Sequence, residues 1–197
     1  MKQKKIVLGI LLALVLLLGA AYLLYAKLGS SIAPNQLSAQ GAQDGAGGAP
    51  DASSQQPQPV PAPDFTVYDG EGNAVHLSDY VGKPVVMNFW ASWCGPCQME
   101  MPDFQAKYEE LGSEVQFLMI NMTGGRETLD SAQKFIAEQG YTFPVFYDTD
   151  SDAAITYGAY SLPTTYFIDA EGNAVAQATG AINGEILQTG IDMIYTP

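Results

Sequence analysis

The chain is expected to adopt an α/β fold: a central mixed β-sheet with helices on both faces, an N-terminal β-hairpin and one N-terminal transmembrane helix. Strand-like and helix-like segments alternate along residues 63–197. Two nearly continuous apolar runs, Val85–Phe89 and Val115–Asn121, are typical of strands buried on both faces of a sheet. Residues 6–25 form an apolar stretch without a charge, which predicts the transmembrane helix.

Residues 1–27 are interpreted as an uncleaved signal-anchor. At about 1.5 Å of rise per residue, some twenty residues cross a hydrocarbon layer of roughly 30 Å. The lysines that precede the apolar stretch, Lys2, Lys4 and Lys5, favour a cytoplasmic N-terminus. A cleaved signal peptide is the alternative, although its apolar region is usually shorter, about 7–15 residues. Both interpretations predict an extracytoplasmic domain, and the first predicts a single-pass protein of the cell membrane.

Residues 28–62 are rich in Ala, Gly, Ser, Gln and Pro, which predicts a disordered linker. From Leu28 onward the chain has four basic and 21 acidic residues, a formal net charge of −17. This balance argues against binding to nucleic acid or to anionic lipid. Residues 63–197 are numerous enough for one domain with its own packed core.

The first half of this domain begins with a predicted hairpin, in which residues 65–68 and 74–77 flank the turn Asp69–Asn73. The apolar run Val85–Phe89 predicts the central strand. A helix is expected from Cys94 to about Leu111, followed by a second buried strand at Val115–Asn121.

The second half begins with a predicted helix at residues 128–139. Its apolar residues recur at helical spacing, and Gly140 is expected to end it. Residues 165–169 and 174–178 predict another hairpin. Asn183 is expected to cap a last helix, whose apolar positions are Ile186, Leu187, Ile191 and Ile194.

The chain has only two cysteines, Cys94 and Cys97, at the start of the first predicted domain helix. Thiols at this spacing can close into a disulfide and reopen. A helix N-terminus favours the reactive thiolate through its free N–H groups and the positive end of its dipole. Cys94 is expected to be exposed and to attack the disulfide of a partner, and Cys97 to resolve the mixed disulfide. Pro96 removes an N–H that the first turn does not need.

Two other interpretations of the cysteine pair are weaker. Structural zinc needs four ligands, and this chain offers no other cysteine and only one histidine, His76. We therefore expect no metal. A purely structural disulfide across so small a loop would add little stability.

The residues around the motif carry a resemblance to a known family. The run Val85–Pro102 includes Trp93-Cys94-Gly95-Pro96-Cys97 and the Glu100-x-Pro102 that follows it. A later run, Ser161–Tyr166, looks like a cis-proline loop. Together they resemble the membrane-anchored TlpA/ResA-like thiol-disulfide oxidoreductases of the thioredoxin superfamily. The resemblance covers residues 63–197 and implies a thioredoxin-like fold, with which the order of the predicted elements agrees.

The resemblance implies a role for each residue of the site. Cys94 would be the nucleophile, Cys97 the resolving thiol and Glu100 the active-site glutamate. Pro163 would be a cis-proline that faces the cysteine pair. The client would lie against the residues beside these groups, namely Trp93, Gly95, Pro96, Leu162 and Pro163.

At two positions this chain carries a different residue from the proteins that it resembles. Thioredoxins carry a buried Asp where this chain has Asn88, so Glu100 becomes the better candidate to take the proton of the resolving thiol. A buried Asn88 needs hydrogen-bond partners, and we interpret it as a satisfied structural group. ResA carries an acidic residue between its cysteines, where this chain has Gly95.

The sequence therefore predicts an extracytoplasmic protein disulfide reductase that acts as a monomer and uses the Cys94–Cys97 dithiol without another cofactor. Gly-Pro between the cysteines is the pair of thioredoxin, a reductant at about −270 mV, whereas the oxidant DsbA lies near −120 mV. The resemblance implies a membrane electron donor of the CcdA/DsbD type. It also implies clients such as apocytochrome c, in cytochrome c maturation, or a methionine sulfoxide reductase. The alternatives are an oxidative disulfide-forming catalyst and a non-enzymatic peptide-binding or chaperone module; a peroxidase fits this spacing less well.

Overall fold

The computed structural model describes residues 37–39 and 59–197. The predicted membrane anchor, residues 1–27, lies outside this part of the chain. Within the described residues, no helix is both long enough and apolar enough to cross a membrane.

The described residues form a nine-stranded mixed sheet, in the order β1-β9-β8-β5-β6-β7-β3-β4, with β2 also paired to β9. The central strand β5 (Val85–Trp90) is buried along its whole length, as its apolar sequence predicts. It runs parallel to β6 (Gln116–Asn121) and antiparallel to β8 (Thr164–Ile168). Next to β8, in antiparallel orientation, lies β9 (Asn173–Thr179).

The predicted first hairpin is confirmed as β3 (Thr66–Tyr68) and β4 (Ala74–His76), which pair antiparallel. A short 3-10 helix, η1 (Leu77–Tyr80), follows β4. The strand β3 joins the rest of the sheet through a single residue pair, Tyr68 with Tyr147 of β7.

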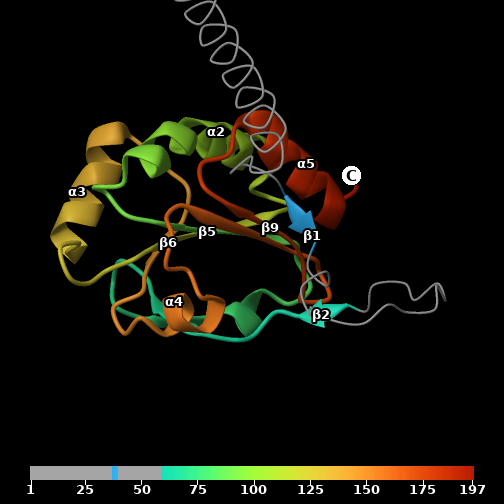
Figure 1. Ribbon diagram of the computed structural model, residues 1–197, viewed down its shortest axis with the longest axis horizontal. Coiled ribbons are helices and arrows are strands. Elements are labelled where there is room, and N and C mark those ends of the chain that lie inside the picture. The colour runs from blue at the N-terminus through green and yellow to red at the C-terminus, as the bar shows by residue number, and fades with distance from the viewer. Residues whose placement is uncertain (1–36, 40–58) are drawn as a thin grey trace, which may run out of the picture. The chain divides into compact units, whose positions relative to one another are not determined.

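Helices cover both faces of the sheet (Figure 1). On one face lie α2 (Gly95–Leu111), α3 (Leu129–Gln139) and α5 (Gly184–Ile194). On the other face lies α4 (Asp152–Tyr157), together with η1. Because each face has its own cover, the sheet separates two clusters of buried side chains. One includes Phe104, Phe117 and Leu187, and the other includes Phe89, Leu118 and Ile120.

The helix boundaries follow the capping residues. Thr128 caps α3 by accepting a hydrogen bond from the N–H of Ser131 on its hydroxyl. Gly140 ends the same helix with a φ of 70°, a left-handed conformation that glycine adopts without a steric penalty. The side chain of Asn183 accepts from the N–H of Ile186 and starts α5, as predicted.

Besides the short 3-10 helix η1, two elements of the domain do not appear in the sequence prediction, β7 (Val145–Tyr147) and α4. Both are too short to show a period. The three residues of β7 pair in parallel with the end of β6, and α4 spans only six residues. Tertiary contacts rather than local pattern therefore define these elements.

The predicted disordered linker contains two short strands, β1 (Ser38–Ala39) and β2 (Val60–Pro61). Both pair antiparallel with β9, at Gln177–Ala176 and at Ala174–Asn173 respectively. At these positions the linker backbone is part of the sheet. Without β1 and β2, β9 would be an edge strand, and its unpaired N–H and C=O groups are what the two segments bind. Residues 28–36 and 40–58 of the predicted linker lie outside the described residues.

The strand directions bring several loops to one end of the sheet. Since β5 and β6 are parallel, both finish at this end, at Trp90 and Asn121. The antiparallel β8 begins there, because Thr164 lies opposite Phe89, and β9 finishes there, because Thr179 lies opposite Thr164. We call this the motif end of the sheet, since the residues after β5 are those of the cysteine motif.

Candidate active site

Cys94 and Cys97 form a disulfide at the motif end of the sheet. Their Cα atoms lie 5.3 Å apart. Cys94 is the N-cap of α2, and its Sγ accepts a hydrogen bond of 3.3 Å from the N–H of Cys97. The N–H of Cys97 is one of the free groups of the first helical turn, so it would also face a thiolate on Cys94 after the disulfide is reduced.

The expectation that Cys94 is exposed is wrong for the disulfide form. Cys94 is only 4% exposed and Cys97 is fully buried. Cys94 belongs to the same cluster of buried residues as Trp90 and Met101, and its sulfur is bonded back onto the helix. The neighbouring Trp93, Gly95 and Pro96 are exposed instead, so the surface beside the disulfide is made by residues flanking the cysteines.

Glu100 is a buried carboxyl group on α2, three residues after Cys97 and therefore on the same side of the helix. Its side chain is 1% exposed. Oε1 accepts a hydrogen bond of 2.8 Å from Nδ2 of Asn88, and Oε2 accepts one of 2.9 Å from the N–H of Ile182. These two donors come from β5 and from the loop after β9, so distant parts of the chain fix the carboxyl group.

Among the influences on the pKa of Glu100, the removal of its carboxyl group from water is the largest. Burial raises the pKa of Glu100 from 4.5 to about 7, and the negative charge of Asp103 adds to the rise. The hydrogen bonds from Ile182 and Asn88 favour the carboxylate and keep the pKa from rising further. Near neutral pH this carboxyl group is therefore poised to take up or release a proton.

Asn88 is part of this arrangement rather than an isolated structural group. Its Nδ2 donates to Glu100 and also to Oγ1 of Thr165, at 3.0 Å. Its Oδ1 has no hydrogen-bond partner among the described residues. The interpretation of Asn88 as a satisfied polar group is thus only half right, because the amide nitrogen is satisfied and the oxygen is not.

The peptide bond between Leu162 and Pro163 is cis, as predicted. Pro163 immediately precedes β8 and so lies at the motif end of the sheet. Within the described part of the chain, neither the N–H nor the C=O of Leu162 has a hydrogen-bond partner. This main chain is therefore available for pairing with an extended peptide.

Sequence reasoning missed Glu127, which holds the loop in front of the motif. Glu127 is 2% exposed and accepts hydrogen bonds from the N–H and the hydroxyl of Ser92, at 3.2 and 2.9 Å. It also accepts one of 3.1 Å from Nδ2 of Asn121, at the end of β6. The carboxylate thereby ties the motif loop to the neighbouring strand. A glutamate after Gly124-Gly125 carries no local sign of burial, so the sequence gives little means to find it.

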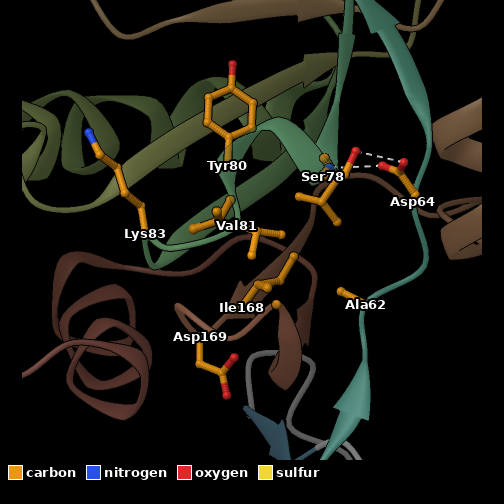
Figure 2. Close-up of a pocket in the computed structure, with 11 residues that line it drawn as sticks. Ala62, Asp64, Ser78, Tyr80, Val81, Lys83, Ile168 and Asp169 are labelled. Carbon is orange, nitrogen blue, oxygen red and sulfur yellow. Dashed lines mark hydrogen bonds between the residues drawn. The ribbon is translucent and has the colours of Figure 1, made fainter.

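A separate hollow of about 90 Å³ lies at the opposite end of the sheet (Figure 2). Its lining includes Val85, where β5 begins, and Ile168, where β8 ends. The carboxylate of Asp64 at its rim already accepts hydrogen bonds from the N–H and hydroxyl of Ser78. The hollow is therefore distinct from the disulfide site, and the carboxylate at its rim is already engaged.

Comparison with known proteins agrees with this geometry. A sequence model of the AhpC/TSA family matches residues 60–177. The thiol-disulfide oxidoreductase ResA of Bacillus thuringiensis (strain Al Hakam) is 38% identical over 130 residues, which cover 64% of this chain and 72% of that protein. ResA of Bacillus subtilis (strain 168) is 34% identical over 134 residues, which cover 68% and 73%.

A solved structure shows the same fold. The exposed lipoprotein thioredoxin of Streptococcus pneumoniae strain TIGR4 superposes with a TM-score of 0.58 at 33% identity. The matched region covers 66% of this chain and 99% of that one. The architecture of the described domain is therefore thioredoxin-like.

Proposed function

The chain belongs to the AhpC/TSA family and is a ResA-like thiol-disulfide oxidoreductase, and from this premise we propose that it works as a protein disulfide reductase. The observation that carries the proposal is the disulfide at the N-terminus of α2, with the N–H of Cys97 directed at the sulfur of Cys94. Reduction rather than oxidation is favoured by Gly95-Pro96 between the cysteines, the pair found in reducing thioredoxins.

In the proposed reaction the reduced protein donates two electrons to a client disulfide. The thiolate of Cys94 attacks one client sulfur, the client disulfide breaks, and the second client sulfur leaves as a thiolate that takes up a proton. The thiolate of Cys97 then attacks Cys94 in the mixed disulfide. This step releases the first client sulfur and leaves the client as a dithiol and the protein as the Cys94–Cys97 disulfide.

Glu100 is proposed to accept the proton of the Cys97 thiol before the second attack. The proposal rests on its position three residues after Cys97 and on its burial beside the motif. A carboxyl group with a pKa of about 7 can receive a proton and release it again near neutral pH. A surface glutamate with an ordinary pKa would be a poorer base for this step.

The client is proposed to bind as an extended segment along Leu162 and Pro163, with Trp93, Gly95 and Pro96 beside it. The unpaired main chain of Leu162 supports this placement, and so does the exposure of the three motif residues. Main-chain pairing would give affinity for many sequences, which suits a protein with more than one client.

We further propose that the domain works outside the cytoplasm, anchored by residues 1–27 and acting as a monomer. The uncharged stretch at residues 6–25 and the lysines before it support this location. A membrane electron carrier of the CcdA/DsbD type would regenerate the dithiol. Apocytochrome c, during cytochrome c maturation, and an extracytoplasmic methionine sulfoxide reductase are the clients that the family resemblance suggests.

The test is the equilibrium reduction potential of the full-length protein in detergent, measured against glutathione and dithiothreitol buffers. A potential at or below about −250 mV supports a reductase. A potential above about −150 mV would show that the dithiol form is strongly favoured, as in an oxidant that makes disulfides. If a Cys94→Ser variant, which cannot exchange disulfides, still performed the function of the protein in the cell, a peptide-binding module would be favoured instead.

A further inference from the structure

The loop after β6 places a positively charged side chain beside the cysteine motif. This loop turns sharply at Gly124 and Gly125, which have φ values of 145° and 59°, and closes with a bridge between Gly124 and Glu127. Glu127 is fixed by Ser92 and Asn121, as described above. Arg126 lies between the turn and this anchor, so its backbone is held next to the motif loop.

The guanidinium of Arg126 lies over the indole ring of Trp93, the residue before Cys94. Its Cζ lies 3.8 Å from the centroid of the ring. Trp93 is 47% exposed and Arg126 is also exposed, so the pair lies at the surface. Within the described residues, Arg126 has neither an ion pair nor a hydrogen bond. The N–H donors of its guanidinium are therefore free to bind a further group.

No other described cation occupies a comparable position. Lys107 pairs with Glu110 at 2.7 Å, and Lys134 lies 3.8 Å from Glu138. Lys83 lines the hollow at the opposite end of the sheet. Arg126 is thus the only basic side chain of the described residues at the motif end, in a protein that is otherwise strongly acidic.

From this placement we propose that Arg126 and Trp93 form a clamp for client segments that carry a carboxylate next to the cysteine under attack. The proposal rests on the proposed reductase function, because it requires a client sulfur to reach Cys94. A residue that flanks this sulfur would lie against the Trp93 ring and the edge of the Arg126 guanidinium. A guanidinium can bind a carboxylate through two parallel hydrogen bonds while its face remains on an aromatic ring.

The acidic surroundings do not cancel this preference. Charges at a solvent-exposed surface are screened beyond about 8 Å at physiological ionic strength, so most of the net negative charge acts weakly on a bound side chain. The Glu127 carboxylate, although adjacent in sequence, is buried and engaged by three hydrogen bonds. A client carboxylate in contact with Arg126 would therefore experience mainly the positive charge.

The test uses three synthetic peptides with an internal disulfide, identical except for Glu, Gln or Lys beside the first cysteine. Reduced full-length protein in detergent is mixed with each peptide, and the reduction rate is measured by acid quenching and chromatography. The Glu peptide is expected to react roughly two- to tenfold faster than the Lys peptide, as a contact ion pair at a surface allows. The ratio should shrink as the salt concentration rises.

Substitutions of Arg126 test whether the clamp causes the difference between the reduction rates of the Glu and Lys peptides. Arg126→Gln should bring the ratio of the Glu and Lys rates to about one, Arg126→Glu should invert it, and Arg126→Lys should keep part of it. Lys134→Gln, a matched removal of a remote cation, should leave the ratio as in the wild type. Because each variant is judged by a ratio of its own rates, a general loss of activity does not imitate the effect.

The outcomes separate the clamp from the reductase function. Equal rates for the three peptides in the wild type, or an unchanged ratio in Arg126→Gln, would overturn the clamp and leave the reductase standing. Failure of the wild type to reduce any of the peptides would overturn both. A ratio that is lost in Lys134→Gln as well would show that overall charge, and not the clamp, selects the client.

Discussion

The most informative single substitution is Glu100→Gln, because it removes a titratable carboxyl group that is almost fully buried. The raised pKa of Glu100 has a defined consequence for stability. Between pH 4.5 and about 7 the native protein holds a proton on Glu100 that the unfolded chain has released. Stability must therefore fall as the pH rises through this window.

The size of the effect follows from the two pKa values. A rise from 4.5 to about 7 corresponds to roughly 3 kcal/mol of stability that is present at pH 4 and lost by pH 8. The glutamine in Glu100→Gln does not titrate. It keeps one acceptor for Asn88 or Ile182 and places its NH₂ against the other donor, which costs about 1–3 kcal/mol at every pH.

The assay is urea unfolding of the oxidised full-length protein in detergent, from pH 5 to pH 8.5. The difference in unfolding free energy between wild type and Glu100→Gln should change by about 2–3 kcal/mol across this range, in favour of the variant at high pH. Glu109→Gln, an exposed position on the same helix, serves as the control and should show no such trend. A pH-independent difference for Glu100→Gln would refute the argument that burial controls this carboxyl group.

Three further predictions concern the motif, its anchor and the core. Cys94→Ser should abolish disulfide reduction, whereas Cys97→Ser should accumulate a mixed disulfide with a client, visible as a mass shift on non-reducing gels; an unreactive Cys97→Ser would reverse the assigned roles. Glu127→Ala should lose roughly 2–4 kcal/mol in urea unfolding, because one buried and two partly buried donors lose their acceptor; a loss below about 0.5 kcal/mol would show that water replaces it. Gly190→Ala should destabilise the protein by about 1–3 kcal/mol despite the better helix propensity of alanine, because the new Cβ would overlap the ring of Phe167; an increase in melting temperature would show that the ring can move aside.

The parts of the fold that the sequence predicts are those with local signals. The run Val85–Phe89 has no polar residue apart from Asn88, which identifies a strand buried on both faces. Asn183 and Gly140 mark the ends of helices through hydrogen-bonding and backbone preferences that involve only nearby residues. The cysteine spacing and the flanking Trp93 likewise stand within one short segment.

The parts that the sequence does not predict depend on contacts between distant residues. Glu127 becomes a buried anchor only because β5 and β6 end side by side, which brings Ser92 and Asn121 to it. The exposure of Cys94 was predicted from its position at a helix start, but the surrounding core determines it. The two residues of β1 have no periodicity of their own, and only the free edge of β9 makes them a strand.

The pairing of β1 and β2 with two parts of β9 has a consequence for how the protein behaves at high concentration. Along β9, hydrogen-bonding groups that would otherwise face solvent are paired with β1 and β2 of the same chain. An unprotected edge invites a second copy to add its own strand, which leads to aggregation. At the other border of the sheet, β4 offers only three residues, too few for a stable intermolecular ladder. Within the described residues, the chain thus supplies its own protection against strand-to-strand association, and it does so with a segment whose composition alone suggests nothing more than a spacer.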